Sequence, residues 1–450
     1  MFLLFLPIIS TRHMQTIVLT YSRKEKCLMK NNLYSNRNII AIDLKSFFAS
    51  CECIERGLDP FTTPLVVCDP TRNGAITLAV TPFLKKLGVP SRGRAYDLPK
   101  NIKIFKAPPH MSLYIKKSRE ILGIYLEYIS KDDIHVYSID EVFLDVTDYL
   151  HMYNMTDYEL AQTIIDDIKK RTGLTTTAGI GPNILLAKIA MDIEAKHVQN
   201  NIAKWTYEDV KTKLWSITPL SKMWSIGPRM ERNLNKLGLY KVRDIAKYDK
   251  NKLKDKYGII GLELWEHANG IDNARISDFN SYIPKENSIS HSQILFKDYN
   301  QNNIILIIRE MVSVLVKRLR TARKQTSSIG LGIGYSKEIG GGFYHVTKLD
   351  TSTFKENEIA DICLNMFDKY YEEYMPIRKV SISFGRLSDD VGIQLNIFES
   401  YEEEKIIKNS DIIIDELNNK YGANMILKAS SLLEDSTIRM RNGKIGGHHA

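Results

Sequence analysis

Three carboxylate side chains stand at the ends of predicted strands. Asp43 ends an apolar run that starts at residue 38, and Asp140 and Glu141 lie where two predicted strands of segment 134–147 meet. Hard divalent cations need oxygen ligands, and a cluster of acids can hold two of them. Such a cluster suits phosphoryl transfer. The alternative is that Asp43 caps a helix and that Asp140 and Glu141 form a polar hairpin turn, and these residues alone leave it open.

An alternation of strands and helices must position these acids. Segment 38–57 is predicted to form a strand, a tight turn and a helix, and a small basic α/β insert occupies 47–108. The hydrophobic spacing then predicts a helix at 111–129, the strand pair at 134–147, a helix at 158–171, a strand at 174–180 and a helix at 183–195. This order is compatible with an antiparallel sheet backed by helices on one face.

The remaining chain changes character twice. Residues 205–275 carry helical patterns without β-branched runs, and 276–286 is polar enough for a linker. Beyond it the patterns predict a strand (287–296), a helix (301–323), strands (327–336 and 342–352), a helix (355–373) and a strand (377–387). The fold is therefore predicted to be α+β and multidomain. An acidic helical segment at 399–418 follows, and no packed core is evident in the last 63 residues.

Composition excludes some classes of protein. The chain has 450 residues, of which 44% are hydrophobic and 26% charged, so a largely disordered chain or a fibre is excluded. The formal net charge of +9 allows an anionic partner without identifying one. Five scattered cysteines do not form a disulfide framework, and Cys51-x-Cys53 lacks the usual zinc spacing, so we expect a cytoplasmic protein.

The N-terminal ten residues are apolar but too few to span a bilayer, and no basic residue precedes them. We therefore expect neither a signal peptide nor a membrane partner. Residues 1–36 are predicted to be an N-terminal extension, with Met29 as a candidate alternative start.

Three ordered motifs carry a family resemblance. IAIDLKSFFAS (40–50), YSIDEVFLD (137–145) and TAGIGPNILLAKIA (177–190) resemble the palm signatures of Y-family, translesion DNA polymerases. SISHSQILF (288–296), QLNIF (394–398) and the terminal IGGHHA resemble the bacterial UmuC-type branch. The resemblance covers about residues 38–450.

The resemblance implies a right-hand polymerase. Its parts would be a ferredoxin-like palm (37–46 and 109–197), small α/β fingers (47–108), a thumb with a helix-hairpin-helix (198–275), a linker (276–286), a βαββαβ little finger (287–388) and a C-terminal tail (389–450). The implied activity is DNA-templated addition of deoxynucleotides to a primer 3′ end. Low-fidelity translesion synthesis in an SOS-type damage response would be its purpose.

Carried onto this sequence, the resemblance makes Asp43, Asp140 and Glu141 the ligands of two Mg2+ ions, and the backbone carbonyl of Leu44 a further ligand. Primer-template DNA and deoxynucleoside triphosphates are the implied substrates. Damage-response activators are a further expected class of partner, and a nucleoid-associated location follows.

Phe48 matches the family's steric gate, an aromatic ring under the sugar of the incoming nucleotide, and the alternative is a core aromatic. Phe47 belongs to the same nucleotide-pocket segment, although we expect its side chain to face the core. Lys188 matches a lysine that contacts the triphosphate, and the alternative is a solvated lysine.

The fingers depart from the family pattern. Where many relatives have a Tyr and an Arg on the phosphates, this chain has Pro82 and Lys85. Pro82 cannot donate a hydrogen bond, so Thr81 is the candidate replacement. Lys85 supplies charge but not a bidentate fork.

Two segments are candidates for DNA contact. The turn Ile226-Gly227-Pro228 resembles that of a helix-hairpin-helix, in which Gly227 and Arg229 would meet a DNA phosphate; a plain αα-hairpin is the alternative. A basic run, residues 317–324, ends the helix 301–323 and either compensates its dipole or grips DNA.

Gln394, Leu395, Ile397 and Phe398 resemble the pentapeptide that binds the bacterial sliding clamp, with a hydrophobic docking segment as the alternative. Two other functions compete with a polymerase. One is a catalytically inactive repair scaffold that binds DNA and the clamp, and the other is a nucleotidyl cyclase built on a related palm.

Overall fold

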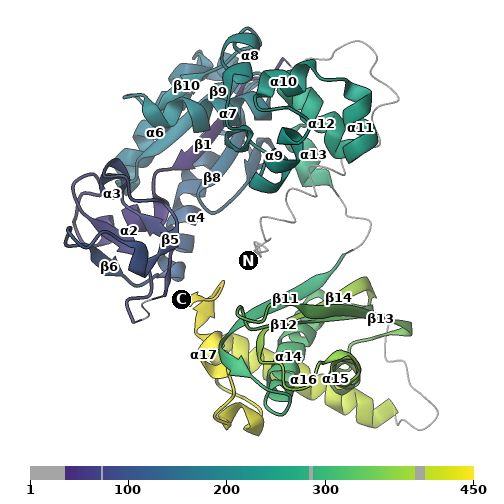
Figure 1. The fold of residues 1–450 in the computed structure, drawn as a ribbon. Helices are drawn as coiled ribbons and strands as arrows, with labels where there is room; N and C mark the ends of the chain where they lie inside the picture. Colours follow the sequence, from purple (N-terminus) through teal and green to yellow (C-terminus); the bar gives the residue numbers. More distant parts are fainter. Residues whose placement is uncertain (1–35, 72–73, 283–286, 391–400, 450) are drawn as a thin grey trace. The chain divides into compact units, whose positions relative to one another are not determined.

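The computed structural model describes residues 36–71, 74–282, 287–390 and 401–449, with side chains described from 409 in the last range. The predicted N-terminal extension and clamp-like pentapeptide lie outside the described residues. The chain divides into two compact units, one formed by residues up to 282 with 448–450 and the other by 283–447 (Figure 1). Each unit is described by itself.

The first unit is built on a mixed sheet in the order β10-β9-β1-β8-β7. Its strands are β1 (Ile39–Leu44), β7 (Ile134–Val136), β8 (Glu141–Asp145), β9 (Thr176–Gly181) and β10 (Ile202–Lys204). β1 is antiparallel to both β8 and β9, whereas β10 runs parallel to β9. The predicted antiparallel sheet therefore has one parallel edge strand, which lies inside the range predicted for the thumb.

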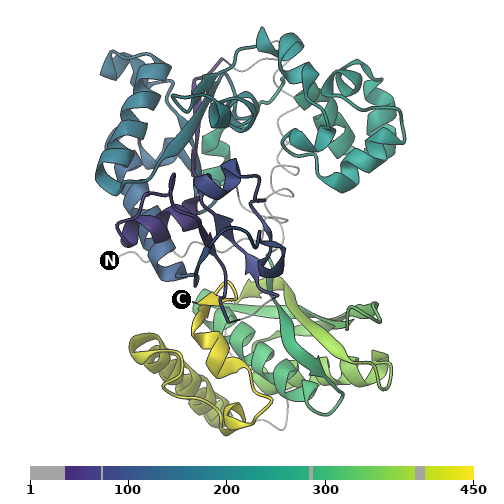
Figure 2. The ribbon, with the colours of Figure 1, turned by 60° about the vertical axis from the view of Figure 1, so that its left-hand side comes forward.

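Helices cover both faces of this sheet. α4 (Met111–Tyr128) and α6 (Asp157–Thr172) share a hydrophobic core with Ile40, Ile42 and Leu44 of β1. α7 (Ile184–Ile193) packs on the opposite face of the sheet, against Ile39 and Ala41. The helices on either side of the sheet can be followed in the turned ribbon of Figure 2. The expectation that all helices lie on one face is wrong, because the outward-facing residues of β1 are as apolar as the inward-facing ones.

Glycine at position 179 permits the close approach of α7 to β9. A Cβ at Gly179 would lie 2.1 Å from the carbonyl oxygen of Ala187 and 2.4 Å from the backbone nitrogen of Met191. Any side chain at this position therefore pushes the helix away from the strand. Gly179 pairs with Ala41 and Thr177 pairs with Asp43, so α7 crosses the sheet close to Asp43.

The predicted insert 47–108 begins with α2 (Phe47–Glu55) and carries two small sheets, ordered β4-β2-β6 and β3-β5. The strands are β2 (Leu65–Val67), β3 (Ile76–Thr77), β4 (Ala79–Val80), β5 (Gly93–Arg94) and β6 (Phe105–Ala107). α3 (Pro82–Lys86) begins at Pro82, as its fixed backbone angle predicts.

The rest of the first unit is helical apart from β10. It contains α5 (Tyr149–Tyr153), α8 (Asp209–Thr212), α9 (Pro228–Asn235), α10 (Val242–Lys247), α11 (Lys250–Tyr257), α12 (Ile259–Ala268) and α13 (Ile276–Ser281). α13 occupies the first half of the predicted linker. Ile276 is buried, and the ring of Phe279 stacks on His135 with centroids 4.3 Å apart, so these residues belong to the packed unit.

The second unit has the predicted βαββαβ order. β11 (Ile289–Tyr299), β12 (Lys324–Tyr335), β13 (Gly342–Thr353) and β14 (Ile377–Asp389) form an antiparallel sheet in the order β11-β14-β12-β13. α14 (Ile304–Ala322) and α15 (Glu356–Tyr370) share a core with the inward residues Ile329, Leu331 and Ile333. Facing the other way on β12 are the small residues Gly330 and Gly332.

The C-terminal tail is docked on this unit. α16 (Tyr401–Tyr421) presents Asp411 and Asp415 to Arg320 of α14, at 3.0 and 2.8 Å. Further along, the buried carboxylate of Glu310 accepts hydrogen bonds from the backbone nitrogen and hydroxyl of Thr437, both at 3.1 Å. α17 (Ile438–Asn442) and the short strand β15 (Lys444–Ile445) follow in this unit, whereas the short strand β16 (His448–His449) is counted with the first unit. The tail therefore packs on α14 of the second unit through polar contacts.

Candidate active site

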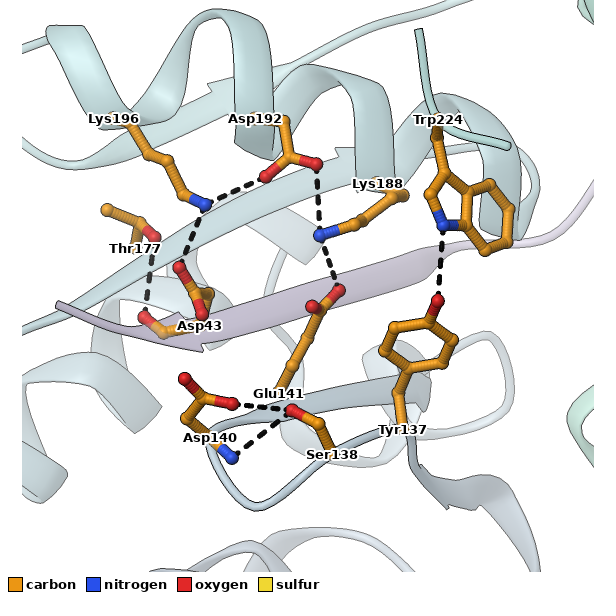
Figure 3. A network of polar contacts seen from close by, with 10 residues as sticks. All are labelled: Asp43, Tyr137, Ser138, Asp140, Glu141, Thr177, Lys188, Asp192, Lys196 and Trp224. Carbon is orange, nitrogen blue, oxygen red and sulfur yellow. Dashed lines mark hydrogen bonds and ion pairs between the residues drawn. The ribbon is translucent and has the colours of Figure 1, made fainter. Parts of the chain in front are cut away.

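Two of the predicted acids meet on neighbouring strands. Asp43 of β1 and Glu141 of β8 are antiparallel register partners, so their side chains project from the same face of the sheet. Asp140 lies in the turn just before β8, where its carbonyl accepts a hydrogen bond of 3.0 Å from the backbone nitrogen of Leu44. Figure 3 shows the three carboxylates around the end of β1. The fold thus brings Asp43, Asp140 and Glu141 together.

Two lysines, one on α7 and one in the turn that follows it, contact these acids. The amine of Lys188 lies 2.7 Å from Glu141, and that of Lys196 lies 2.9 Å from Asp43. Asp192 bridges the two lysines, at 2.9 Å from Lys188 and 2.8 Å from Lys196 (Figure 3). Lys188 and Asp192 stand four residues apart on one helix face, and Lys196, in the following 3-10 turn (Ala195–His197), continues that row.

Burial and the neighbouring lysines have opposite effects on the pKa of these carboxylates. Burial raises the pKa of Asp43, and the neighbouring Lys196 acts to lower it. Burial also raises the pKa of Glu141 to about 7, against the opposing effect of Lys188. Both acids therefore sit where their ionised forms need a nearby cation, which the lysines provide here.

Further lysines approach from other segments. Burial and repulsion from Lys86, Lys196 and Lys85 lower the pKa of Lys45, which follows β1. Burial lowers the pKa of Lys85, which interacts electrostatically with Asp43 and Asp140. Within the described part of the chain, Lys45 and Lys85 form no ion pair. Lysine side chains from three segments therefore surround the acids.

The donor set fits hard divalent cations. Asp43, Asp140 and Glu141 offer only oxygen atoms, which Mg2+ prefers, and the half-buried pair of Asp43 and Glu141 needs neutralisation. Among the described residues, however, no group of three or more His, Cys, Asp and Glu side chains is close enough to hold a metal ion as it stands. Lys188 and Lys196 occupy the carboxylates of Glu141 and Asp43, so a bound cation would have to displace them.

The two phenylalanines of α2 have different surroundings. Phe47 is buried in the core with 3% of its surface exposed, so the structure does not support its assignment to the nucleotide pocket. Phe48 is half-buried, and its ring stacks on Tyr114 with centroids 4.3 Å apart and planes 13° from parallel.

The structure does not support the assignment of Thr81 to the triphosphate. Thr81 is fully buried, and its hydroxyl donates a hydrogen bond of 2.8 Å to the carbonyl of Thr63. In this arrangement the hydroxyl of Thr81 serves the fold of the fingers segment. Pro82 begins α3 as its first residue, which leaves Lys85 as the candidate contact from this helix.

The predicted DNA contacts Gly227 and Arg229 are exposed. Gly227 is the N-cap of α9, and Arg229 lies in its first turn. Exposed backbone N–H groups at a helix start suit a phosphate. In the basic run of α14, by contrast, Arg320 pairs with Asp411 and Asp415, so this arginine holds the tail.

Sequence reasoning missed three residues of the site: Asp192, Lys196 and Lys45. The four-residue spacing of Lys188, Asp192 and Lys196 was visible in the sequence. The sequence did not show that this row lies over Asp43, which depends on the close packing of α7 on β9.

Family comparisons agree with this geometry. The impB/mucB/samB family matches residues 42–192, its C-terminal domain matches 286–397, and its helix-hairpin-helix motif matches 207–239. UvrX of Bacillus subtilis, named as a UV-damage repair protein, is 38% identical over 419 residues, which are 92% of this chain and 98% of UvrX. The chain belongs to this family, the Y-family DNA polymerases. DNA polymerase activity is thus the activity of its family.

Other Y-family relatives extend over most of the chain. DNA polymerase IV 2 of Bacillus subtilis is 31% identical over 415 residues, covering 91% of this chain and 98% of that protein. A solved Y-family polymerase chimera, Dbh-Dpo4-Dbh, matches with a TM-score of 0.62 at 21% identity, covering 78% of this chain and 99% of its own. This likeness shows the right-hand polymerase fold. Among the described residues, no helix is long and apolar enough to cross a membrane.

Proposed function

We propose that this chain is a DNA-templated DNA polymerase that extends a primer 3′ end with low fidelity, and that it serves translesion synthesis in an SOS-type damage response. The observation that carries the proposal is the register pair of Asp43 and Glu141, with Asp140 beside it, surrounded by lysines from three segments. Acids that can bind metal next to several lysines suit a substrate with a metal-bound polyphosphate.

Asp43, Asp140, Glu141 and the backbone carbonyl of Leu44 would hold two Mg2+ ions. When bound, these ions would activate the primer hydroxyl and stabilise the charge that develops at the α-phosphate. The protein's own contribution is to hold its carboxylates on and beside two paired strands, so that metal binding needs no rearrangement of the backbone. The cations would compete with Lys188 and Lys196 for Glu141 and Asp43.

The displaced lysines would then be available to the triphosphate. Lys188 and Lys196 are held on one side of the acids by α7 and the turn after it, and Lys85 lies on the fingers segment. Lysine suits this task because it acts as a compact positive charge. Phe48 would lie under the sugar, where a 2′-hydroxyl would collide with its ring.

The DNA would be held without reading its sequence. Gly227 and Arg229 would contact a backbone phosphate at the start of α9. In the second unit, the face of the sheet opposite the helices is open: Ser292 and Ser381 are hydrogen-bonded across β11 and β14 at 2.8 Å, Gly330 and Gly332 lie on β12, and the exposed rings and aliphatic groups of Ile294, Tyr344 and Val346 share this face. Binding should weaken steeply as salt concentration rises.

We also propose that residues 394–398 bind the sliding clamp, through Gln394 and the apolar Leu395, Ile397 and Phe398. Changing Gln394→Ala together with Phe398→Ala should remove stimulation of synthesis by the clamp. Clamp-independent synthesis should be unchanged. Stimulation that persists in the double variant would show that the clamp binds elsewhere.

Primer extension by the full chain, with Mg2+ and templates that are either undamaged or carry one abasic site, tests the proposed function. We expect nucleotide addition on both templates. Failure on both, with DNA still bound in a mobility assay, would instead indicate a repair scaffold. Extension that stops at every abasic site would retain the polymerase and contradict bypass of this lesion.

A further inference from the structure

The ring that supports Phe48 is itself tied to a buried carboxylate. Tyr114 of α4 is fully buried under the Phe48 ring, and its hydroxyl donates a hydrogen bond of 2.6 Å to Glu52. Glu52 is also fully buried and lies on α2, one helical turn after Phe48. The two helices therefore meet at a stacked pair of rings and a charged hydrogen bond.

Both carboxylate oxygens of Glu52 have polar partners. The oxygen that accepts from Tyr114 also lies 2.8 Å from Nδ1 of His110, the residue that caps α4, and the second oxygen pairs with Arg56. Arg56, the C-cap of α2, follows Glu52 by four residues, and Tyr114 follows His110, the N-cap of α4, by the same spacing.

This arrangement does more than fill space. A buried carboxylate carries a large desolvation cost, and an apolar side chain of similar volume would serve packing equally well. What the carboxylate adds is direction, because a charge-assisted hydrogen bond fixes the hydroxyl of Tyr114 and hence the plane of its ring. The Phe48 ring lies parallel to that plane.

We infer that Glu52 is a positioning residue for sugar selection: through Tyr114 it holds the ring of Phe48 against displacement by a ribose 2′-hydroxyl. This inference rests on the proposed role of Phe48 as the gate. The Phe48 ring excludes a ribose by collision only if the ring cannot move aside. Weakening the contact that holds Tyr114 should therefore admit ribonucleotides, while the metal-binding acids stay in place.

The test compares Glu52→Gln and Tyr114→Phe with the parent enzyme and with Phe48→Ala. For each protein, kcat/KM is measured for a ribonucleoside and a deoxyribonucleoside triphosphate of the same base opposite the same template base. The ratio of the two values does not depend on the fraction of folded enzyme, so partial unfolding does not mask the result. Both positioning variants should raise relative ribonucleotide use by about threefold to tenfold, the loss of one hydrogen bond.

Tyr149→Phe is the matched control. Tyr149 also donates its hydroxyl to a carboxylate, Asp133, at 2.8 Å, but it lies on α5 and does not contact Phe48. Its variant should keep the parent ratio. If Phe48→Ala raises ribonucleotide use while Glu52→Gln and Tyr114→Phe do not, the gate stands and the positioning role is wrong. If Phe48→Ala leaves the ratio unchanged, the gate itself is wrong and the positioning role falls with it.

Discussion

Asp43 faces Glu141 across the β1–β8 ladder as its direct register partner, and each carboxylate is held by a different lysine. Both acids are half-buried, and their desolvation raises the pKa of each. Such a pair is stable only with neutralising cations beside it. The lysines provide these cations here, and in the proposed function divalent metal ions would take their place.

Replacing Lys196 should have two opposite effects. In Lys196→Met, Asp43 loses the cation that competes with metal, so the Mg2+ concentration for half-maximal primer extension should fall. The KM for the incoming nucleotide should rise by about tenfold to a hundredfold, because a charged contact to the triphosphate is lost. Steady-state kinetics with Mg2+ and nucleotide varied separately measure both effects.

Lys204→Met is the control for that experiment. Lys204 also forms an ion pair, at 2.8 Å, but its partner is Asp157, which is not one of the acids of the site. It should change neither constant. An unchanged nucleotide KM in Lys196→Met would contradict the triphosphate role of Lys196.

Gly179→Ala should destabilise the protein and reduce activity together. The added Cβ would overlap the backbone of α7 at Ala187 and Met191, so the helix that carries Lys188 must move. Overpacking of this kind typically costs about 1–3 kcal/mol or more. Gly123→Ala, in the open middle of α4, should leave stability equal or higher. Thermal unfolding measures both, and equal melting temperatures for the two variants would contradict the close packing.

Arg320 should anchor the C-terminal tail. Arg320→Ala removes contacts to Asp411 and Asp415, and residues 401–447 should become more sensitive to limited proteolysis. Arg309→Ala on the same helix removes only a longer, exposed pair with Asp361 at 3.4 Å and should have little effect. Equal proteolysis of the two variants would show that the tail is held by other contacts.

His135 should make the first unit less stable in acid. Burial lowers the pKa of His135 to about 4 from 6.5, so the unfolded chain binds a proton that the folded chain does not between these pH values. Stability should therefore fall as pH drops through this window. In His135→Phe, the melting temperature should fall less between about pH 7 and about pH 5 than in the parent. An equal or larger fall would contradict a neutral, buried imidazole stacked on Phe279.

Elements with a long, regular hydrophobic pattern could be predicted from the sequence. Short elements that depend on tertiary contacts could not. The 3.6-residue spacing predicted α14 at 301–323, which the structure places at Ile304–Ala322. β10 was missed because three residues carry too little pattern, and α13 because its apolar Ile276 and Phe279 stand in a polar segment.

The candidate site was predictable in part. The motifs around Asp43, Asp140 and Glu141 pointed to one place because each acid ends a strand or begins one. Lys196 could not be assigned without the crossing of α7, and Thr81 looked available because sequence does not show that its hydroxyl is used by Thr63. The distinction between Phe47 and Phe48 followed from their neighbouring positions on one helix turn.

The central claim is that Asp140 and Glu141 belong to the polymerase site, and Mg2+-dependent primer extension by the double variant Asp140→Ala, Glu141→Ala tests it most directly. Asp148→Ala, an exposed acid at the start of α5, is the control. We predict that the parent and the control extend the primer and that the double variant binds DNA but adds no nucleotide. Extension by the double variant at the parent's rate would contradict the account.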